Sequence, residues 1–181
     1  RRTAAALGYN ECVTYSFVDA QAAALFGGGD DATMLENPIS SEMSHMRPNL
    51  LGGLLRAVAR NQARGFMDMA LFEVGAGFHG GEPGEQHMLV SGVLIGKTGP
   101  KDVHGTSRPV DLYDAKADAE AVLAAIGAPA KVQILRGAAD WWHPGRHGKI
   151  CLGPKKVLAV FGELHPKVLR EMDIKGPAVA F

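Results

Sequence analysis

The segment that decides the fold is NPISSEMSHMRPNLLGGLLRAVARNQARGFMDMALFEVGAGF, residues 37–78. Its polar lead ends in Arg47-Pro48, and a leucine-rich stretch with helical spacing follows. Proline suits the first turn of a helix, where its missing N–H would have no partner, so the segment predicts a helix that opens at Pro48 and ends at Gly65. Residues 69–78 are mostly apolar and predict a strand.

The predicted helix has an apolar face and a basic face. At about 100° per residue, one broad face collects Leu50, Leu51, Leu54, Leu55, Val58 and Ala59. The opposite face carries Arg56, Arg60 and Arg64. Gly52 and Gly53 would each cost about 1 kcal/mol relative to alanine, which indicates a close neighbouring backbone. The candidates for a subunit interface or scaffold are Arg47, Pro48, Leu50, Leu51, Leu54 and Leu55.

Outside this segment, short helices alternate with strands joined by turns. Residues 11–18 alternate apolar with small or β-branched side chains, which is typical of a half-buried strand. Residues 69–78 and 87–97 are apolar on both faces and belong in the centre of a covered sheet. Asp19 and Asp114 are predicted helix N-caps. Further strands are predicted at residues 110–114, 130–135, 149–152 and 157–162, and loops at 96–109 and 136–148. Since hairpin turns link most strands, the predicted fold is α+β, with a mainly antiparallel sheet flanked by helices.

Length, composition and charge restrict the class of protein. A chain of 181 residues, 46% of them hydrophobic, suits one core, so a single domain is predicted over residues 1–181. Nineteen basic and nineteen acidic residues cancel, so no overall field attracts nucleic acid or lipid. No apolar run reaches about 18 residues, so no membrane span is predicted. Cys12 and Cys151 lie far apart without a disulfide spacing, which favours a reducing cytoplasm.

Two short motifs resemble ligand sites, and neither has the context that the site needs. Gly96-Lys97-Thr98 looks like the end of a phosphate-binding loop, but strand residues precede it and Gly99-Pro100 blocks the required helix. His143 and His147 have the spacing of a helical zinc pair, but Pro144-Gly145 lies between them and no third ligand stands at a recognisable spacing. No metal is therefore assigned. Nor is there a GxSxG elbow for a serine nucleophile.

Other polar side chains have two readings. Candidates for contact with RNA or phosphate are Arg56, Arg60, Arg64, Trp142, His143 and Arg146. The helical arginines are either solvated or paired with acids, or they meet tRNA. The tryptophan loop either anchors on the core or touches a phosphate or base. Glu73 and Glu163 are either buried functional acids or carboxylates paired with a local arginine or backbone N–H.

Six segments, in order, resemble the catalytic-like module of the β subunit of bacterial phenylalanyl-tRNA synthetases. They are residues 8–17, residues 37–55, residues 71–75, residues 114–123, residues 143–146 and residues 161–166. Ala117 stands where the family usually has glycine. The chain opens on Arg1-Arg2 without methionine or signal peptide, so we expect a piece of a longer protein.

The resemblance implies a class II aminoacyl-tRNA synthetase-like core, and a cytoplasmic (αβ)2 enzyme in which the α subunit attaches phenylalanine to tRNA with ATP. ATP and magnesium are then cofactors of the holoenzyme, and none is expected in this module. The partners implied are the α subunit and, through the whole enzyme, tRNA.

The same resemblance implies a module without catalytic residues. Class II synthetases hold ATP with two arginines, because a bent triphosphate needs fixed positive charge. No arginine lies between Gly65 and Phe72, where the strand carrying the first is expected, and the second is not seen. The alternative function is an active class II ligase-type domain that itself binds ATP and an amino acid.

Overall fold

The computed structural model describes residues 1–99, 103, 105 and 107–181. Its main sheet has seven strands in the order β1-β4-β5-β9-β8-β7-β6. In that order they are Asn10–Glu11, Met69–Phe78, Gln86–Ile95, Ala178–Ala180, Lys156–Leu164, Trp142–Leu152 and Gln133–Leu135. Strand β1 runs parallel to β4, and the other neighbouring pairs are antiparallel, as predicted. A small second sheet pairs β2 (Phe17–Val18) with β3 (His45–Met46).

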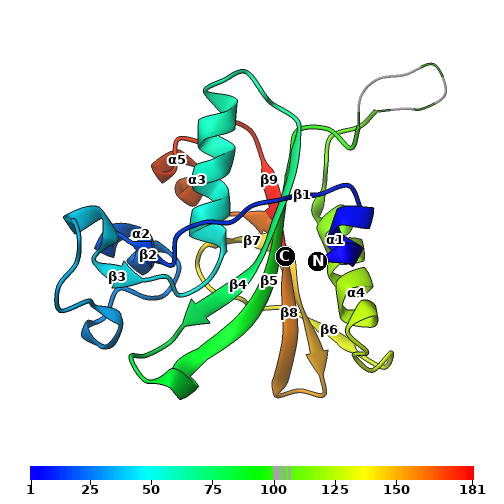
Figure 1. The fold of residues 1–181 in the computed structure, drawn as a ribbon. Coiled ribbons are helices and arrows are strands. Elements are labelled where there is room, and N and C mark those ends of the chain that lie inside the picture. Colours follow the sequence, from blue (N-terminus) through cyan, green and yellow to red (C-terminus); the bar gives the residue numbers. More distant parts are fainter. Residues whose placement is uncertain (100–102, 104, 106) are drawn as a thin grey trace.

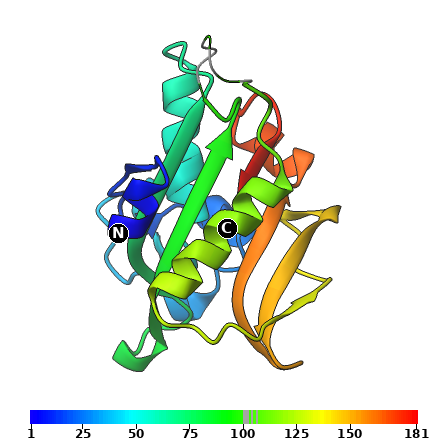
Figure 2. The same cartoon turned by 90° about the vertical axis from the view of Figure 1, so that its right-hand side faces the viewer.

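Helices cover both faces of the main sheet (Figures 1 and 2). The α-helices are α1 (Arg2–Ala6), α2 (Ala20–Leu25), α3 (Leu51–Gln62), α4 (Leu112–Ala125) and α5 (Pro166–Glu171). Single 3₁₀ turns are η1 (Asp31–Thr33), η2 (Ser41–Met43) and η3 (Pro83–Glu85). One core lies between α3 and the sheet and the other between α4 and the sheet. The domain is therefore a three-layer α+β sandwich with the sheet in the middle.

The central hairpin matches the expectation from sequence. Strands β4 and β5 pair over ten residues each, from Met69 opposite Ile95 to Phe78 opposite Gln86. Their side chains alternate between the two cores, which is why both faces of these strands are apolar. The predicted loop at residues 96–109 lies partly outside the described residues.

The prediction of one strand over residues 11–18 is wrong. The chain leaves β1 at Glu11 and enters the second sheet at Phe17. The residues between them, which connect the two sheets, belong to no strand. The physical reason is that Thr14 is held by the side chain of Glu73 rather than by a backbone ladder. This crossing segment, residues 12–16, is part of the site described below.

Four other assignments differ from the predictions. The strand predicted over residues 110–114 does not form, because α4 begins at Leu112. Asp111, not Asp114, caps α4, because its carboxylate accepts from Tyr113 N at 2.8 Å. Asp114 instead closes a capping box by accepting from Asp111 N at 2.8 Å. Helix α3 begins at Leu51, so Pro48 lies before it. Strand β7 begins at Trp142 and takes up much of the predicted tryptophan loop.

Candidate functional site

Among the described residues, the most deeply buried ion pair joins Arg47 and Glu73. Their side chains are only 5% and 4% exposed, and Arg47 Nη1 lies 2.8 Å from Glu73 Oε1. Arg47 Nη1 also donates to Thr14 Oγ1 at 2.9 Å, and its Nε donates to the carbonyl oxygen of Ala76 at 2.9 Å. Gly75 leaves room for the guanidinium, since a Cβ there would lie 2.5 Å from Arg47 Nη2.

The same pair holds the crossing segment in place. Thr14 donates to Glu73 twice, from its backbone N at 3.2 Å and from its hydroxyl at 2.7 Å. Cys12 N donates to the Phe72 carbonyl at 2.7 Å, and Arg47 N donates to the Ser16 carbonyl at 2.9 Å. Glu73 is thus the carboxylate of a structural ion pair, with both oxygens engaged.

The predicted interface or scaffold residues lie inside the domain. Arg47 and Pro48 are buried, and Leu50, Leu51, Leu54 and Leu55 are at most 4% exposed. They fill the core between α3 and the sheet, so the interface alternative does not hold for these side chains. Gly53 faces Thr14, whose Cβ would lie 2.9 Å from a Cβ at Gly53. The close neighbour inferred from the glycines is therefore a side chain, not a backbone.

The three predicted helical arginines do not form one stripe. Arg56 pairs with Asp19, whose side chain also caps α2 through Ala22 N at 2.8 Å. Although partial burial opposes it, the bonds from Ala22 N and Arg56 lower the pKa of Asp19. Arg60 is exposed on the last turn of α3, whereas Arg64 lies beyond the end of the helix at Gln62.

Of the candidate RNA or phosphate contacts in the tryptophan segment, Trp142 is buried, His143 is partly exposed and Arg146 is exposed. Trp142 is 5% exposed and belongs to the core, so its ring has no face free for a base. Arg146 donates two hydrogen bonds to Glu163, at 2.6 and 2.7 Å. Glu163 is therefore paired with a nearby arginine, one of the two alternatives left by the sequence. His147 Nδ1 lies 2.6 Å from the His143 carbonyl oxygen, so this histidine donates to its neighbour's backbone. Within the described residues, no group of three or more His, Cys, Asp or Glu side chains could hold a metal.

Residues 12–16 instead present a surface that sequence reasoning missed. The alternation is inverted, with Cys12, Thr14 and Ser16 partly buried. Val13 and Tyr15 point outward and are 89% and 75% exposed. The sequence feature that could have revealed this orientation is the small size of the inward residues, because it lets Thr14 approach α3 closely at Gly53. This group, Val13 and Tyr15 together with Phe17, which is 36% exposed, is called the outward strip.

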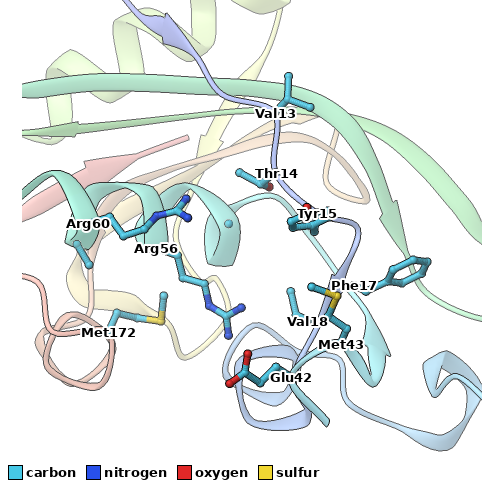
Figure 3. Close-up of a pocket in the computed structure, with 12 residues that line it drawn as sticks. Val13, Thr14, Tyr15, Phe17, Val18, Glu42, Met43, Arg56, Arg60 and Met172 are labelled. Atoms are coloured by element: carbon cyan, nitrogen blue, oxygen red, sulfur yellow. The ribbon is translucent and has the colours of Figure 1, made fainter. Parts of the chain in front are cut away.

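The outward strip borders a hollow of about 520 Å³. Figure 3 shows Arg56 and Arg60 extending into it from α3, with Glu42, Met43 and Val18 across from them. Met172 closes the end near α5. The hollow is mainly apolar with a charged rim, which suits a macromolecular surface better than a small polar substrate.

A second contact, partly buried and also missed from sequence, joins Tyr9, which follows α1, to α4. The Tyr9 hydroxyl donates to Asp118 Oδ2 at 2.6 Å. Burial, helped by the nearby Asp114 charge, raises the pKa of Asp118 although the Tyr9 bond opposes the shift. Burial and the Asp118 bond raise the pKa of Tyr9. Rings of Phe72 and Phe181 pack edge-on against Tyr9.

The comparisons with known proteins agree over the whole chain. The family model of the phenylalanyl-tRNA synthetase β chain CLM domain matches residues 1–181. The chain belongs to this family. It is 78% identical over 181 residues to the phenylalanine–tRNA ligase β subunit of Ruegeria pomeroyi and 70% identical to that of Cereibacter sphaeroides. It covers 23% and 22% of those proteins, so it spans less than a quarter of their length.

A solved structure supports the fold of this β-chain domain independently. A pyrrolysyl-tRNA synthetase from Desulfitobacterium hafniense aligns with 99% of the chain and 59% of its own, with a TM-score of 0.68. Sequence identity is only 16%, so the likeness is one of fold. The predicted class II synthetase-like core is confirmed. Within the described residues, no helix has the length and apolar character needed to cross a bilayer.

Proposed function

We propose that this domain is a non-catalytic assembly module of a phenylalanine–tRNA ligase β subunit, packing against the catalytic α subunit of an (αβ)2 enzyme in the cytoplasm. The observation that carries the proposal is the outward strip, a set of apolar side chains held in solvent by a buried ion pair. Large contiguous patches of exposed apolar side chains are uncommon on monomeric proteins and mark interaction sites.

Hydrogen bonds from Cys12 and Thr14 to β4 hold the crossing segment that carries Val13 and Tyr15. Thr14, between Val13 and Tyr15, is bonded to Glu73 through both its backbone and its hydroxyl. A partner therefore meets a preformed surface and loses little conformational entropy in ordering it. Aromatic residues, of which Tyr15 and Phe17 are two, are enriched at interface centres.

The rim of the hollow indicates the chemistry of the α-subunit surface. Arg56 is already paired with Asp19, and Glu42 lies on the far side of the hollow. Arg60 is exposed and lines the hollow, so it can meet an acidic group at the edge of an apolar α-subunit surface. Further exposed apolar side chains lie in the segment between α2 and β3, Met34 at 53% and Ile39 at 91%.

The absence of catalysis in this domain is supported by how its arginines are used. Arg47, Arg56 and Arg146 each bond to a carboxylate of the same chain. A triphosphate needs arginines whose donors are free for phosphate oxygens. These three arginines do not have that freedom, and we propose that ATP and magnesium belong to the holoenzyme, with tRNA binding through the whole enzyme.

Calorimetry separates this proposal from the alternative of an active ligase-type domain. The domain is titrated with ATP and magnesium, with and without phenylalanine. No heat of specific binding is expected up to millimolar ATP. Micromolar binding of ATP would overturn the non-catalytic assignment, whatever the result for assembly.

A further inference from the structure

The charges of this chain are unevenly distributed, although their sum is zero. Residues 131–164, from the approach to β6 to the end of β8, carry six lysines and arginines but only two acidic residues, Asp140 and Glu163. The rest of the chain carries thirteen basic and seventeen acidic residues. The strands β6, β7 and β8 therefore form a basic part of a domain that is otherwise acidic.

Five of these six basic side chains have no acidic partner. Arg146 is paired with Glu163. Within the described residues, the other five make neither an ion pair nor a side-chain hydrogen bond. All five are exposed except one, which is half-buried at position 149. This group is called the basic edge, and its members are Lys131, Arg136, Lys149, Lys155 and Lys156. Its positive charge is open to a negatively charged partner.

The strand pairing brings two of these residues together at the outermost strand of the main sheet. Strand β6 is that strand, and its last residue, Leu135, pairs with Lys149 of β7. Arg136 follows directly after Leu135, so it lies next to Lys149 along this edge. Figure 2 shows β6 and β7, in shades of yellow, at the edge of the sheet away from the point marked N.

The other three residues gather at the turn between β7 and β8. Lys155 lies in this turn, and Lys156 begins β8. Gln133 of β6 pairs with Cys151, close before the turn, so Lys131 comes level with the turn itself. The two groups are separated by three to four residues of strand, or about 10–13 Å. The basic edge is therefore long enough to meet several phosphates of one nucleic acid strand.

The types of side chain around the basic edge favour phosphate over a protein surface or an unpaired base. Four of its five members are lysines, which bind phosphate as point charges and are depleted in protein interfaces. The large exposed apolar residues beside them are aliphatic, namely Ile134, Leu135 and Val157. Residues 131–164 are all described, and none of their Phe, Tyr or Trp side chains is exposed, so no exposed ring of these kinds is present on which a base could stack.

We propose that the basic edge contacts the sugar–phosphate backbone of tRNA in the assembled enzyme, without reading its bases. The proposal rests on the proposed function for the identity of the RNA, and on the unpaired charges for the place of contact. It moves the contact away from the residues indicated by sequence. Of those, only Arg146 lies in β7, and Glu163 already engages it.

Charge removal in the enzyme assembled from full-length α and β subunits tests the contact. The triple variant Lys131→Gln/Lys155→Gln/Lys156→Gln changes only exposed side chains, so its thermal midpoint should not change. Fluorescence titration with labelled phenylalanine tRNA should show Kd raised at least about tenfold. The slope of log Kd against log salt concentration should fall by about 2, because each phosphate contact contributes about 0.7–0.9.

The matched control removes the same number of charges elsewhere on the domain. The triple variant Arg2→Gln/Arg170→Gln/Lys175→Gln changes three exposed residues outside the basic edge, on α1, on α5 and after α5. Its Kd for tRNA and its salt dependence should stay close to those of the parent enzyme.

Three results would overturn the proposal. The first is parental affinity and salt dependence in the lysine variant, and the second is an equal loss in the control, which would reflect total charge alone. The third is normal tRNA binding with weakened assembly, measured by sedimentation with α subunit, which would assign the edge to a protein partner. The ATP titration that tests the proposed function does not involve these lysines, so the two proposals can fail separately.

Discussion

Arg47 and Glu73 meet at 2.8 Å inside the domain and tie three separate segments together. Arg47 belongs to the lead before α3, Glu73 to the middle of β4, and Thr14, bonded to both, to the crossing segment. The pair thereby links the core to the surface from which Val13 and Tyr15 project. The orientation of the outward strip is therefore set by a contact that is itself hidden from any partner.

Glu73→Gln should destabilise the domain by about 3–5 kcal/mol, because it leaves the buried guanidinium of Arg47 without its counter-charge. Chemical denaturation measures the loss. Glu163→Gln is the matched control, since its partner Arg146 is 49% exposed and water screens that pair, so the loss there should be much smaller. Equal losses at the two positions would show that burial of the Arg47 pair has no energetic consequence.

Gly53→Ala should destabilise the domain by about 1–3 kcal/mol, although alanine favours helices, because the new Cβ would collide with Thr14. Gly52→Ala is the control. Its Cβ would meet only the Phe26 ring at 3.5 Å, so the change should be neutral or stabilising by up to about 1 kcal/mol. Thermal unfolding of both variants measures which of them is the less stable. A stabilising Gly53→Ala would mean that the crossing segment does not press on α3.

Asp118→Asn should stabilise the domain at neutral pH, because burial disfavours the charged carboxylate and the amide oxygen can still accept from Tyr9. The raised pKa means that folded Asp118 takes up a proton before the unfolded group does. The advantage of asparagine should therefore shrink as pH falls from the raised pKa toward the ordinary value of 3.8. Denaturation midpoints across this range measure the effect.

Asp114→Asn is the control of opposite sign. The bond from Arg108 lowers the pKa of Asp114, so this carboxylate stabilises the fold above its ordinary value of 3.8 and loses the effect as pH falls through its lowered pKa. The asparagine variant should be less stable at neutral pH and approach the parent in acid. The same sign for both variants would contradict these assignments.

Local patterns of sequence predicted the scaffold well. The leucine spacing after Pro48 placed one face of α3 in the core, and the apolar runs around Phe72 and Val93 placed β4 and β5 at the centre of the sheet. Both predictions depend on the spacing of apolar residues along a short stretch, which the local sequence shows directly. Asp19 was also found as a cap, because the capping bond spans three residues.

The site was harder to predict, because long-range partners determine it. An alternating pattern at residues 12–16 has two possible faces, and only the bonds from Thr14 to Glu73, fifty-nine positions away, decide which faces inward. For Arg56 the sequence left the paired and the solvated states open, because its partner Asp19 lies thirty-seven positions earlier. Pairing between distant charges leaves no local signal, and Arg64 was placed on the helix although α3 ends at Gln62.

The most direct test of the account is assembly with the α subunit. The double variant Val13→Ser/Tyr15→Ser in the full-length β subunit removes the most exposed part of the outward strip and should leave the thermal midpoint unchanged. Tyr113→Ser, at an exposed tyrosine of α4 (69%), is the control. Sedimentation with purified α subunit should show Kd for the double variant raised at least about tenfold, with the control unchanged. Assembly of the double variant with parental affinity would contradict the proposal that this surface packs against α.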